Sequence, residues 1–160
     1  MSTNASNSQE YAVHLGRSAR EAAAMLTAVP SGKKDAALRS AAAALRKSAA
    51  LLTAENAKDM QAGRAVGLSK PLLDRLELTP KGIDQMASGL EHIAELVDPV
   101  GEIIRGWRRP NGLLIEKVRV PIGVILIIYE SRPNVTADAA ALTLKSGNAC
   151  MLRGGSEARH

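Results

Sequence analysis

The sequence predicts an α/β fold, in which amino-terminal helices precede a β-hairpin arm and the first βαβ unit of a parallel sheet. Apolar residues recur at helical spacing up to about residue 97, and the pair Asn111-Gly112 separates two extended runs. After residue 122, two short apolar runs flank an alanine-rich helical segment. We therefore expect four parts: a flexible tail at 1–9, helices at 10–100, the hairpin arm at 101–121 and the βαβ unit at 122–160.

The composition is that of a folded domain or of part of one. Hydrophobic residues make up 46% of the 160 residues and charged residues 23%, a balance that excludes a mainly disordered chain. The longest uncharged apolar stretch, 120–129, is about half the roughly 20 residues that a membrane helix needs. The first ten residues show no secretory signal. We expect a cytoplasmic protein with no membrane partner.

The net charge of +5 is compatible with several kinds of anionic partner. Basic residues are scattered, and two Tyr and one Trp offer little aromatic surface for stacking on bases, which disfavours nucleic acid. Phosphorylated metabolites and nucleotides stay open. The single cysteine, Cys150, excludes an internal disulfide and a multi-cysteine zinc site. His14, His92 and His160 lack metal-ligand spacing, so we expect no metal.

Two helical segments open the chain. Residues 10–29 are alanine-rich and end at Pro30 and Gly32, and a longer helix is expected at 34–60. In the longer helix, leucine recurs every seventh residue, at Leu38, Leu45 and Leu52. Three leucines are too few to predict a coiled coil, so we expect this helix to pack against the domain.

A further helix is expected to begin at Thr79-Pro80, since this pair fits an N-cap followed by proline at the first helical position. Apolar residues then step by three and four until Asp98-Pro99 ends the helix. These residues, which predict one packed face, are Ile83, Met86, Leu90, Ile93 and Val97.

The pattern then becomes extended. Residues 101–109 and 113–120 are predicted to pair as a hairpin across the Asn-Gly turn. The run 124–128 is apolar without alternation, which is typical of a strand covered on both faces in a parallel sheet. A helix at 134–145, ended by Gly147, and a second strand at 149–152 complete a βαβ unit. Cys150 lies inside that strand and is expected to act as a small hydrophobic residue.

Polar segments follow both strands of this unit, at 129–134 and 153–157. The carboxyl ends of parallel strands open on one edge of the sheet, where ligands bind. The first segment leads into a helix N-terminus, which favours anions, and the second offers Arg153 beside Gly154 and Gly155. Simpler interpretations stay open, because the glycines could form an ordinary turn and Ser131 or Asn134 could cap the helix.

The string VPIGVILIIYESRPNVTADAAALTLKSGNACMLRGGSEA resembles the signature region of the γ-glutamyl phosphate reductases, also called glutamate-5-semialdehyde dehydrogenases, in the aldehyde dehydrogenase superfamily. ENAKDMQAGRAVGLSKPLLDRLELTP and VDPVGEIIRGW are similar too, so the resemblance runs from about Tyr11 onward. It implies an aldehyde-dehydrogenase-like fold, in which 122–160 begins a Rossmann-like NADP-binding core. It also implies NADPH-dependent reduction of L-glutamyl 5-phosphate to L-glutamate 5-semialdehyde and phosphate in proline biosynthesis, through a cysteine thioester.

The same resemblance implies roles for single residues. Cofactor contacts are expected from Tyr129, Glu130, Arg153, Gly154, Gly155 and Ser156. Arg153 would approach the ribose 2′-phosphate, and Ser156 stands where NAD-preferring relatives often hold an acidic residue, although Glu157 lies next to it. Asn134 is the candidate oxyanion or substrate residue. Cys150 does not match the family's nucleophile, which lies beyond His160.

The chain is thus expected to be the amino-terminal part of such an enzyme, inactive alone. The resemblance also implies a homo-oligomer formed through the hairpin arm, and coupling to glutamate 5-kinase. Two alternatives remain: a non-catalytic nucleotide-binding or oligomerisation module, and a small basic RNA-binding protein.

Overall fold

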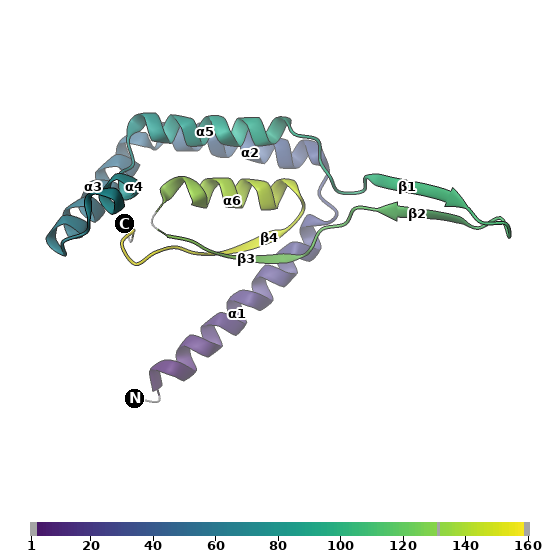
Figure 1. Cartoon of the computed structure of the whole chain (residues 1–160), viewed down its shortest axis with the longest axis horizontal. Helices are drawn as coiled ribbons and strands as arrows, with labels where there is room; N and C mark the ends of the chain where they lie inside the picture. The colour runs from purple at the N-terminus through teal and green to yellow at the C-terminus, as the bar shows by residue number, and fades with distance from the viewer. Residues whose placement is uncertain (1–2, 131, 159–160) are drawn as a thin grey trace.

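The computed structural model describes residues 3–130 and 132–158, which form a helical layer, a parallel strand pair and a projecting hairpin (Figure 1). The elements in chain order are α1 Thr3–Leu26, α2 Ser31–Lys47, α3 Ala49–Ala65, α4 Lys70–Leu76, α5 Pro80–Glu95, β1 Ile103–Arg108, β2 Leu114–Val118, β3 Val124–Ile128, α6 Pro133–Lys145 and β4 Ala149–Arg153. None of the described helices is long and apolar enough to cross a bilayer.

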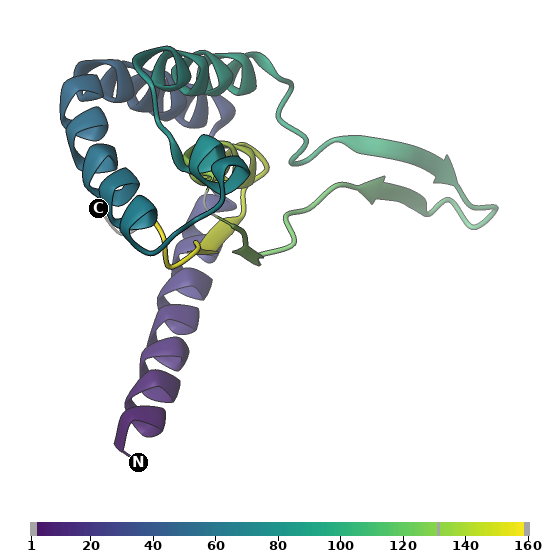
Figure 2. The same cartoon turned by 60° about the vertical axis from the view of Figure 1, so that its left-hand side comes forward.

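The hydrophobic core lies where α2, α5 and α6 meet, with α2 and α5 side by side above α6 (Figures 1 and 2). Its buried members come from all three helices: Leu38, Ala42, Ala87, Leu90, Ile93, Ala94 and Ala141. Alanines on the facing sides allow the helix backbones to approach closely, and burying each leucine or isoleucine contributes about 1.5–3 kcal/mol. The spacing of apolar residues along α5 therefore predicted its packed face correctly.

The end of α5 differs from the prediction. Thr79 caps the helix as expected, because its hydroxyl accepts a hydrogen bond of 3.0 Å from the N–H of Gly82. At the other end the helix stops at Glu95, and Val97 is 88% exposed instead of continuing the packed face. Leu96 has extended dihedral angles, so the periodicity of 3.6 residues no longer applies to Val97.

The prediction of a single helix at 34–60 is wrong. The chain forms two helices there, α2 and α3, with a break at Ser48. Ser48 has φ −92° and ψ 7°, and its N–H donates to the carbonyls of Ala44 and Arg46. After the break α3 turns away from α2 toward α4 (Figure 2). Neither glycine nor proline marks this site, so local sequence carries no strong signal for it.

The first helix begins earlier than expected. Residues 3–9, predicted as a flexible polar tail, are helical and continuous with the alanine-rich segment. Serine and asparagine disfavour helix by only about 0.5 kcal/mol each relative to alanine, so an established helix can extend through them. The amino-terminal half of α1 projects away from the body, while its other end contacts β3 and β4 (Figure 1).

The hairpin arm forms as predicted. Strands β1 and β2 pair antiparallel from Ile103↔Val118 to Arg108↔Leu114, and Gly112 takes a positive φ of 88° at the turn. All six residues of β1 are exposed, and the arm extends away from the helices (Figures 1 and 2). The guanidinium of Arg105 lies 5.4 Å from the ring centroid of Trp107 on the same strand.

Strands β3 and β4 pair in parallel, which confirms the βαβ unit. The register runs from Val124↔Ala149 to Ile128↔Arg153. The expectation that β3 is covered on both faces is wrong for the described residues, since Leu126 is 56% exposed and Ile128 is 69% exposed. The reason is that α6 lies over one face while α1 crosses only part of the other (Figure 1).

Candidate functional site

The candidate site is the rim at the carboxyl ends of β3 and β4. Arg153 lies opposite Ile128 in the register, and the N–H of Tyr129 donates to the carbonyl of Arg153 at 3.1 Å. This hydrogen bond extends the ladder by one step and holds the two segments together. The structure thus brings Tyr129 and Arg153 to the same end of the strand pair, as the crossover rule predicted.

Tyr129 is held in place by the helix that follows it. Its hydroxyl lies 2.5 Å from Oγ1 of Thr136 in α6. A Cβ added to Gly154 would lie 3.5 Å from the same hydroxyl, which is ordinary van der Waals contact. Gly154 therefore approaches the Tyr129 ring closely, and that ring forms one wall of the rim.

Charges at the rim differ in whether they have partners. Arg153 is exposed, and its side chain makes no hydrogen bond or ion pair with any described residue. Glu130 is ion-paired to Arg75 of α4, with an O–N distance of 3.3 Å. Ser156 is exposed and Glu157 half-buried, and both make interactions. Arg153 is thus a cation at the rim that can accept a new anionic partner.

Asn134 occupies a different place. It lies exposed in the first turn of α6 and lines a polar pocket of about 390 Å³ together with Arg75, Arg132 and Asp138. Arg153 does not line this pocket. The N-cap residue of α6 is Arg132, which makes no side-chain capping hydrogen bond, so the alternative in which Asn134 caps the helix is not seen among the described residues. Ser131, the other expected cap, lies outside the described residues.

Cys150 lies in the middle of β4, opposite Ile125 and three positions before Arg153. It is half-buried and forms no disulfide. This position agrees with the expected role of a small hydrophobic residue within the strand. Among the described residues, no group of His, Cys, Asp and Glu side chains could hold a metal ion.

Sequence patterns missed a buried ion-pair cluster at the opposite end of the βαβ unit. Lys34 is 2% exposed and its Nζ lies 2.8 Å from Oδ2 of Asp98. Lys145 is 4% exposed, pairs with Asp35 and donates to the carbonyl of Ala94 at 3.0 Å. Lys33-Lys34 resembles a solvated basic doublet in the sequence, because the partner of Lys34 is 64 residues away.

The cluster sets the ionisation of Asp98. Burial by itself would raise the pKa of this carboxyl group, but the hydrogen bonds from Lys34 Nζ and from the N–H of Val100 hold the pKa below its ordinary value. Asp98 is therefore a carboxylate at neutral pH, and Lys34 has the negative partner that its burial requires.

Next to this cluster, Gly147 and Asn148 fix the base of the hairpin arm. Gly147 has φ 73°, and a Cβ there would lie 3.0 Å from Pro121 and 3.1 Å from Val100. Oδ1 of Asn148 accepts a hydrogen bond of 2.8 Å from the N–H of Gly123. The Lys-Ser-Gly-Asn segment at 145–148 thus has a structural role, which the sequence alone did not assign.

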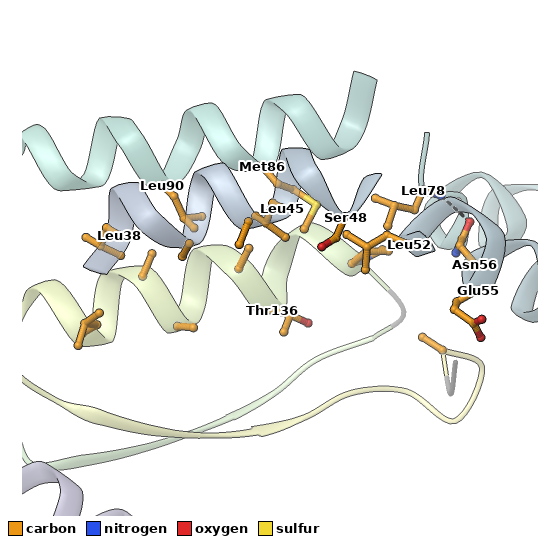
Figure 3. Close-up of a pocket in the computed structure, with 18 of the residues that line it drawn as sticks. Leu38, Leu45, Ser48, Leu52, Glu55, Asn56, Leu78, Met86, Leu90 and Thr136 are labelled. Carbon is orange, nitrogen blue, oxygen red and sulfur yellow. Dashed lines mark hydrogen bonds between the residues drawn. The ribbon is translucent and has the colours of Figure 1, made fainter. Parts of the chain in front are cut away.

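A second cavity, of about 740 Å³, is almost entirely apolar and lies between α2, α3, α5 and α6 (Figure 3). We call it the helical groove. Its wall includes the three leucines at seven-residue spacing, Leu38, Leu45 and Leu52. Its polar residues, which include Ser48, Glu55, Asn56 and Asp59, lie toward the α3 end, and the rest of the wall is apolar.

No family model matches the sequence. Among curated proteins, the chain is similar to the γ-glutamyl phosphate reductase of Rhodospirillum rubrum, with 63% identity over 145 residues, which cover 91% of this chain and 34% of the relative. The corresponding protein of Novosphingobium aromaticivorans is 52% identical over 158 residues, covering 99% of this chain and 37% of its own length. The chain spans about a third of the length of the curated relatives that it matches.

Solved structures give the same result for the fold. The crystal structure of γ-glutamyl phosphate reductase from Thermotoga maritima matches with a TM-score of 0.89 and 43% identity, over 91% of this chain and 35% of that one. The Saccharomyces cerevisiae protein of the same name matches with a TM-score of 0.87 and 35% identity, over 91% of this chain and 37% of that one. The helices, arm and βαβ unit described above are therefore an arrangement shared with these proteins.

Proposed function

Because the chain is homologous to γ-glutamyl phosphate reductases along about 91% of its length, we propose that its residues serve such a reductase. The reaction is the NADPH-dependent conversion of L-glutamyl 5-phosphate to L-glutamate 5-semialdehyde and phosphate, as the resemblance implies. In this proposal the rim holds the phosphate-bearing end of the cofactor. Covalent catalysis by a cysteine thiolate takes place elsewhere, because Cys150 lies inside β4.

The observation that carries the proposal is that the guanidinium of Arg153 has no side-chain partner among residues 3–130 and 132–158. An exposed Arg at the carboxyl edge of a parallel strand pair, beside Gly154 and the fixed ring of Tyr129, can donate two hydrogen bonds to a phosphate. The donor set therefore fits a nucleotide phosphate. When bound, the cofactor supplies the hydride, and this chain's residues bind and orient its adenosine end.

A preference for NADP over NAD is supported by charge. The resemblance puts Ser156 at the position where a carboxylate of NAD-preferring relatives would repel a 2′-phosphate, and a hydroxyl there avoids that repulsion. Two acidic residues lie in the segments at the rim, Glu130 and Glu157, and Glu130 is ion-paired to Arg75. Arg153 has no acidic ion-pair partner among the described residues, which supports its proposed contact with the 2′-phosphate.

The test uses a chimera in which this chain replaces the matched stretch of the Rhodospirillum rubrum relative. We expect turnover of glutamyl phosphate with NADPH, and none by the 160-residue chain alone. Arg153→Ala in the chimera should raise the KM for NADPH by about tenfold or more, with a smaller effect on NADH, because a charge-assisted bidentate contact is lost. Arg64→Ala, at an exposed position near the end of α3, is the matched control, and equal effects on both cofactors would remove Arg153 from the 2′-phosphate role.

Oligomerisation through the hairpin arm is part of the same proposal. Apolar side chains of the arm, including Ile104, Trp107 and Leu114, are exposed, and an exposed apolar patch commonly marks an interface. Leu114→Lys should shift the chimera to a smaller species in sedimentation velocity. Lys117→Glu is the control, because residue 117 lies on the opposite face of β2 from Leu114, and it should leave the sedimentation coefficient unchanged.

A further inference from the structure

The polar pocket of about 390 Å³ lies where α4 and the first turns of α5 and α6 meet, at the same end of the βαβ unit as the rim (Figure 1). Unlike the helical groove, it is lined by charged side chains of both signs. These are Asp74, Arg75, Glu77, Arg132 and Asp138. A cavity of this size holds a small molecule, and its lining predicts a ligand that carries charge.

Arg132 is a cation of the pocket whose side chain has no partner among residues 3–130 and 132–158. Its backbone is fixed, since it is the N-cap residue of α6 and its N–H donates to the carbonyl of Glu130 at 2.8 Å. The other guanidinium, that of Arg75, is ion-paired to Glu130. Arg132 can therefore donate two hydrogen bonds to a carboxylate, at a helix end whose partial positive charge favours the same anion.

Asp138 supplies the opposite charge from the same helix. It is half-buried beside α5, where a Cβ added to Gly89 would lie 3.5 Å from its Oδ1. Its carboxylate makes no hydrogen bond or ion pair with a described residue. Asn134 precedes it by four residues and lies on the same face of α6. The pocket thus presents a guanidinium and a carboxylate that can each take a partner from a ligand.

This mixture of charges decides which ligand the pocket fits. A phosphate dianion would meet three carboxylates and two guanidinium groups, one of them already paired to Glu130, and like charges repel. A ligand that carries both signs of charge would find an opposite charge for each. The ammonium and carboxylate groups of an α-amino acid are attached to one carbon atom and match this arrangement.

The pocket also lies close enough to the rim to serve the same reaction. Arg132 follows Tyr129 by three residues, so the Cα atoms of the two are at most about 11 Å apart. We infer that the polar pocket holds the head group of the amino-acid substrate, with Arg132 on its α-carboxylate and Asp138 on its α-ammonium group. The glutamyl chain then leads from the pocket toward the cofactor at the rim. This inference rests on the proposed function and adds the part of the site that recognises the substrate.

The test runs the chimera in reverse, as phosphate-dependent oxidation of an aldehyde by NADP, with three aldehydes. L-Glutamate 5-semialdehyde carries both charged groups, 5-oxopentanoate lacks the amino group, and 4-aminobutanal lacks the carboxylate. Arg132→Gln should lower kcat/KM by about tenfold or more for the two aldehydes that carry a carboxylate, because a bidentate contact is lost, and by less than about twofold for 4-aminobutanal.

Asp138→Asn should give the complementary result. Here kcat/KM should fall by about tenfold for the two aldehydes that carry an amine, and by less than about twofold for 5-oxopentanoate. The ratio between two aldehydes within one variant does not depend on the fraction of protein that is folded, so partial unfolding cannot imitate either result. Arg64→Gln and Glu95→Gln are the matched controls, at exposed positions outside the pocket, and should leave all the ratios unchanged.

Two results would overturn the inference while leaving the proposed function intact. Equal losses of kcat/KM for all the aldehydes in both variants would show that the two residues do not distinguish the head group. A raised KM for inorganic phosphate in Arg132→Gln, with unchanged aldehyde ratios, would show that the pocket holds phosphate instead. Absence of turnover by the unsubstituted chimera would refute the proposed function, and the inference with it.

Discussion

Lys145 ends α6 and Arg153 ends β4, at opposite ends of the βαβ unit, and the two cations have opposite surroundings. Lys145 is buried, paired with Asp35 and bonded to the carbonyl of Ala94. Arg153 is exposed and has no side-chain partner among the described residues. A buried charge must be compensated by the fold itself, whereas an exposed one can stay free for a ligand. The difference separates a structural end of the βαβ unit from a binding end.

The largest effect should come from removing a cation at the structural end. Lys34→Met leaves the carboxylate of Asp98, whose side chain is 13% exposed, without its lysine partner, so the free energy of unfolding should fall by about 3 kcal/mol. Urea denaturation followed by circular dichroism measures the loss. Lys33→Met, at the exposed neighbour, is the control and should change stability by less than about 0.5 kcal/mol. Similar losses for both would contradict the importance of the buried pair.

A backbone change at the same end should have the next largest effect. Gly147→Ala places a Cβ against Pro121 and Val100 at a positive φ, so we expect a loss of about 1–2 kcal/mol. Gly89→Ala in the middle of α5 meets only ordinary contact with Asp138, and should raise stability by about 0.5–1 kcal/mol. Thermal unfolding of the two variants should therefore shift in opposite directions.

Lowering the pH should reduce the free energy of unfolding, because protonation of Asp98 removes its ion pair with Lys34 at the structural end. Its pKa is lowered in the folded state, so its stabilising contribution is present above the ordinary Asp pKa of about 3.9 and is lost as pH falls through the folded value. Asp98→Asn keeps an acceptor for Lys34 but should flatten this part of the pH dependence. Urea midpoints measured from about pH 5 to about pH 2 test the difference, and an unchanged slope would exclude Asp98 as a contributor.

The smallest effect on stability should come from the binding end. Arg153→Ala removes no contact within the described chain, so the free energy of unfolding should change by less than about 0.5 kcal/mol. The measurement is the same urea titration as for Lys34→Met. A loss comparable to that of Lys34→Met would mean that Arg153 is structural after all.

Local sequence signals predicted the elements whose geometry is set locally. Thr79-Pro80 specified the start of α5 through a hydrogen bond spanning three residues, and Asn111-Gly112 specified the arm through the backbone freedom of one glycine. The apolar runs at β3 and β4 predicted their pairing because a short crossover imposes a parallel register. These features depend on few residues that are close in the sequence.

The features that sequence could not predict depend on distant partners. The break at Ser48 follows from how α3 packs with α4, and the burial of Lys34 follows from Asp98 and Lys145. At the candidate site, the shared position of Tyr129 and Arg153 was predictable from strand direction. The pairing of Glu130 with Arg75 was not predictable, because Arg75 lies 55 residues earlier in the chain.

The arm contains the only tryptophan of the chain, and this has a practical consequence. Trp107 lies on β1, 39% exposed and outside the helical core. The intrinsic fluorescence of the protein therefore reports the surroundings of the arm and is nearly blind to the packing of α2, α5 and α6. A blue shift of emission with rising concentration would signal that the arm has become covered, even while the helices stay unchanged.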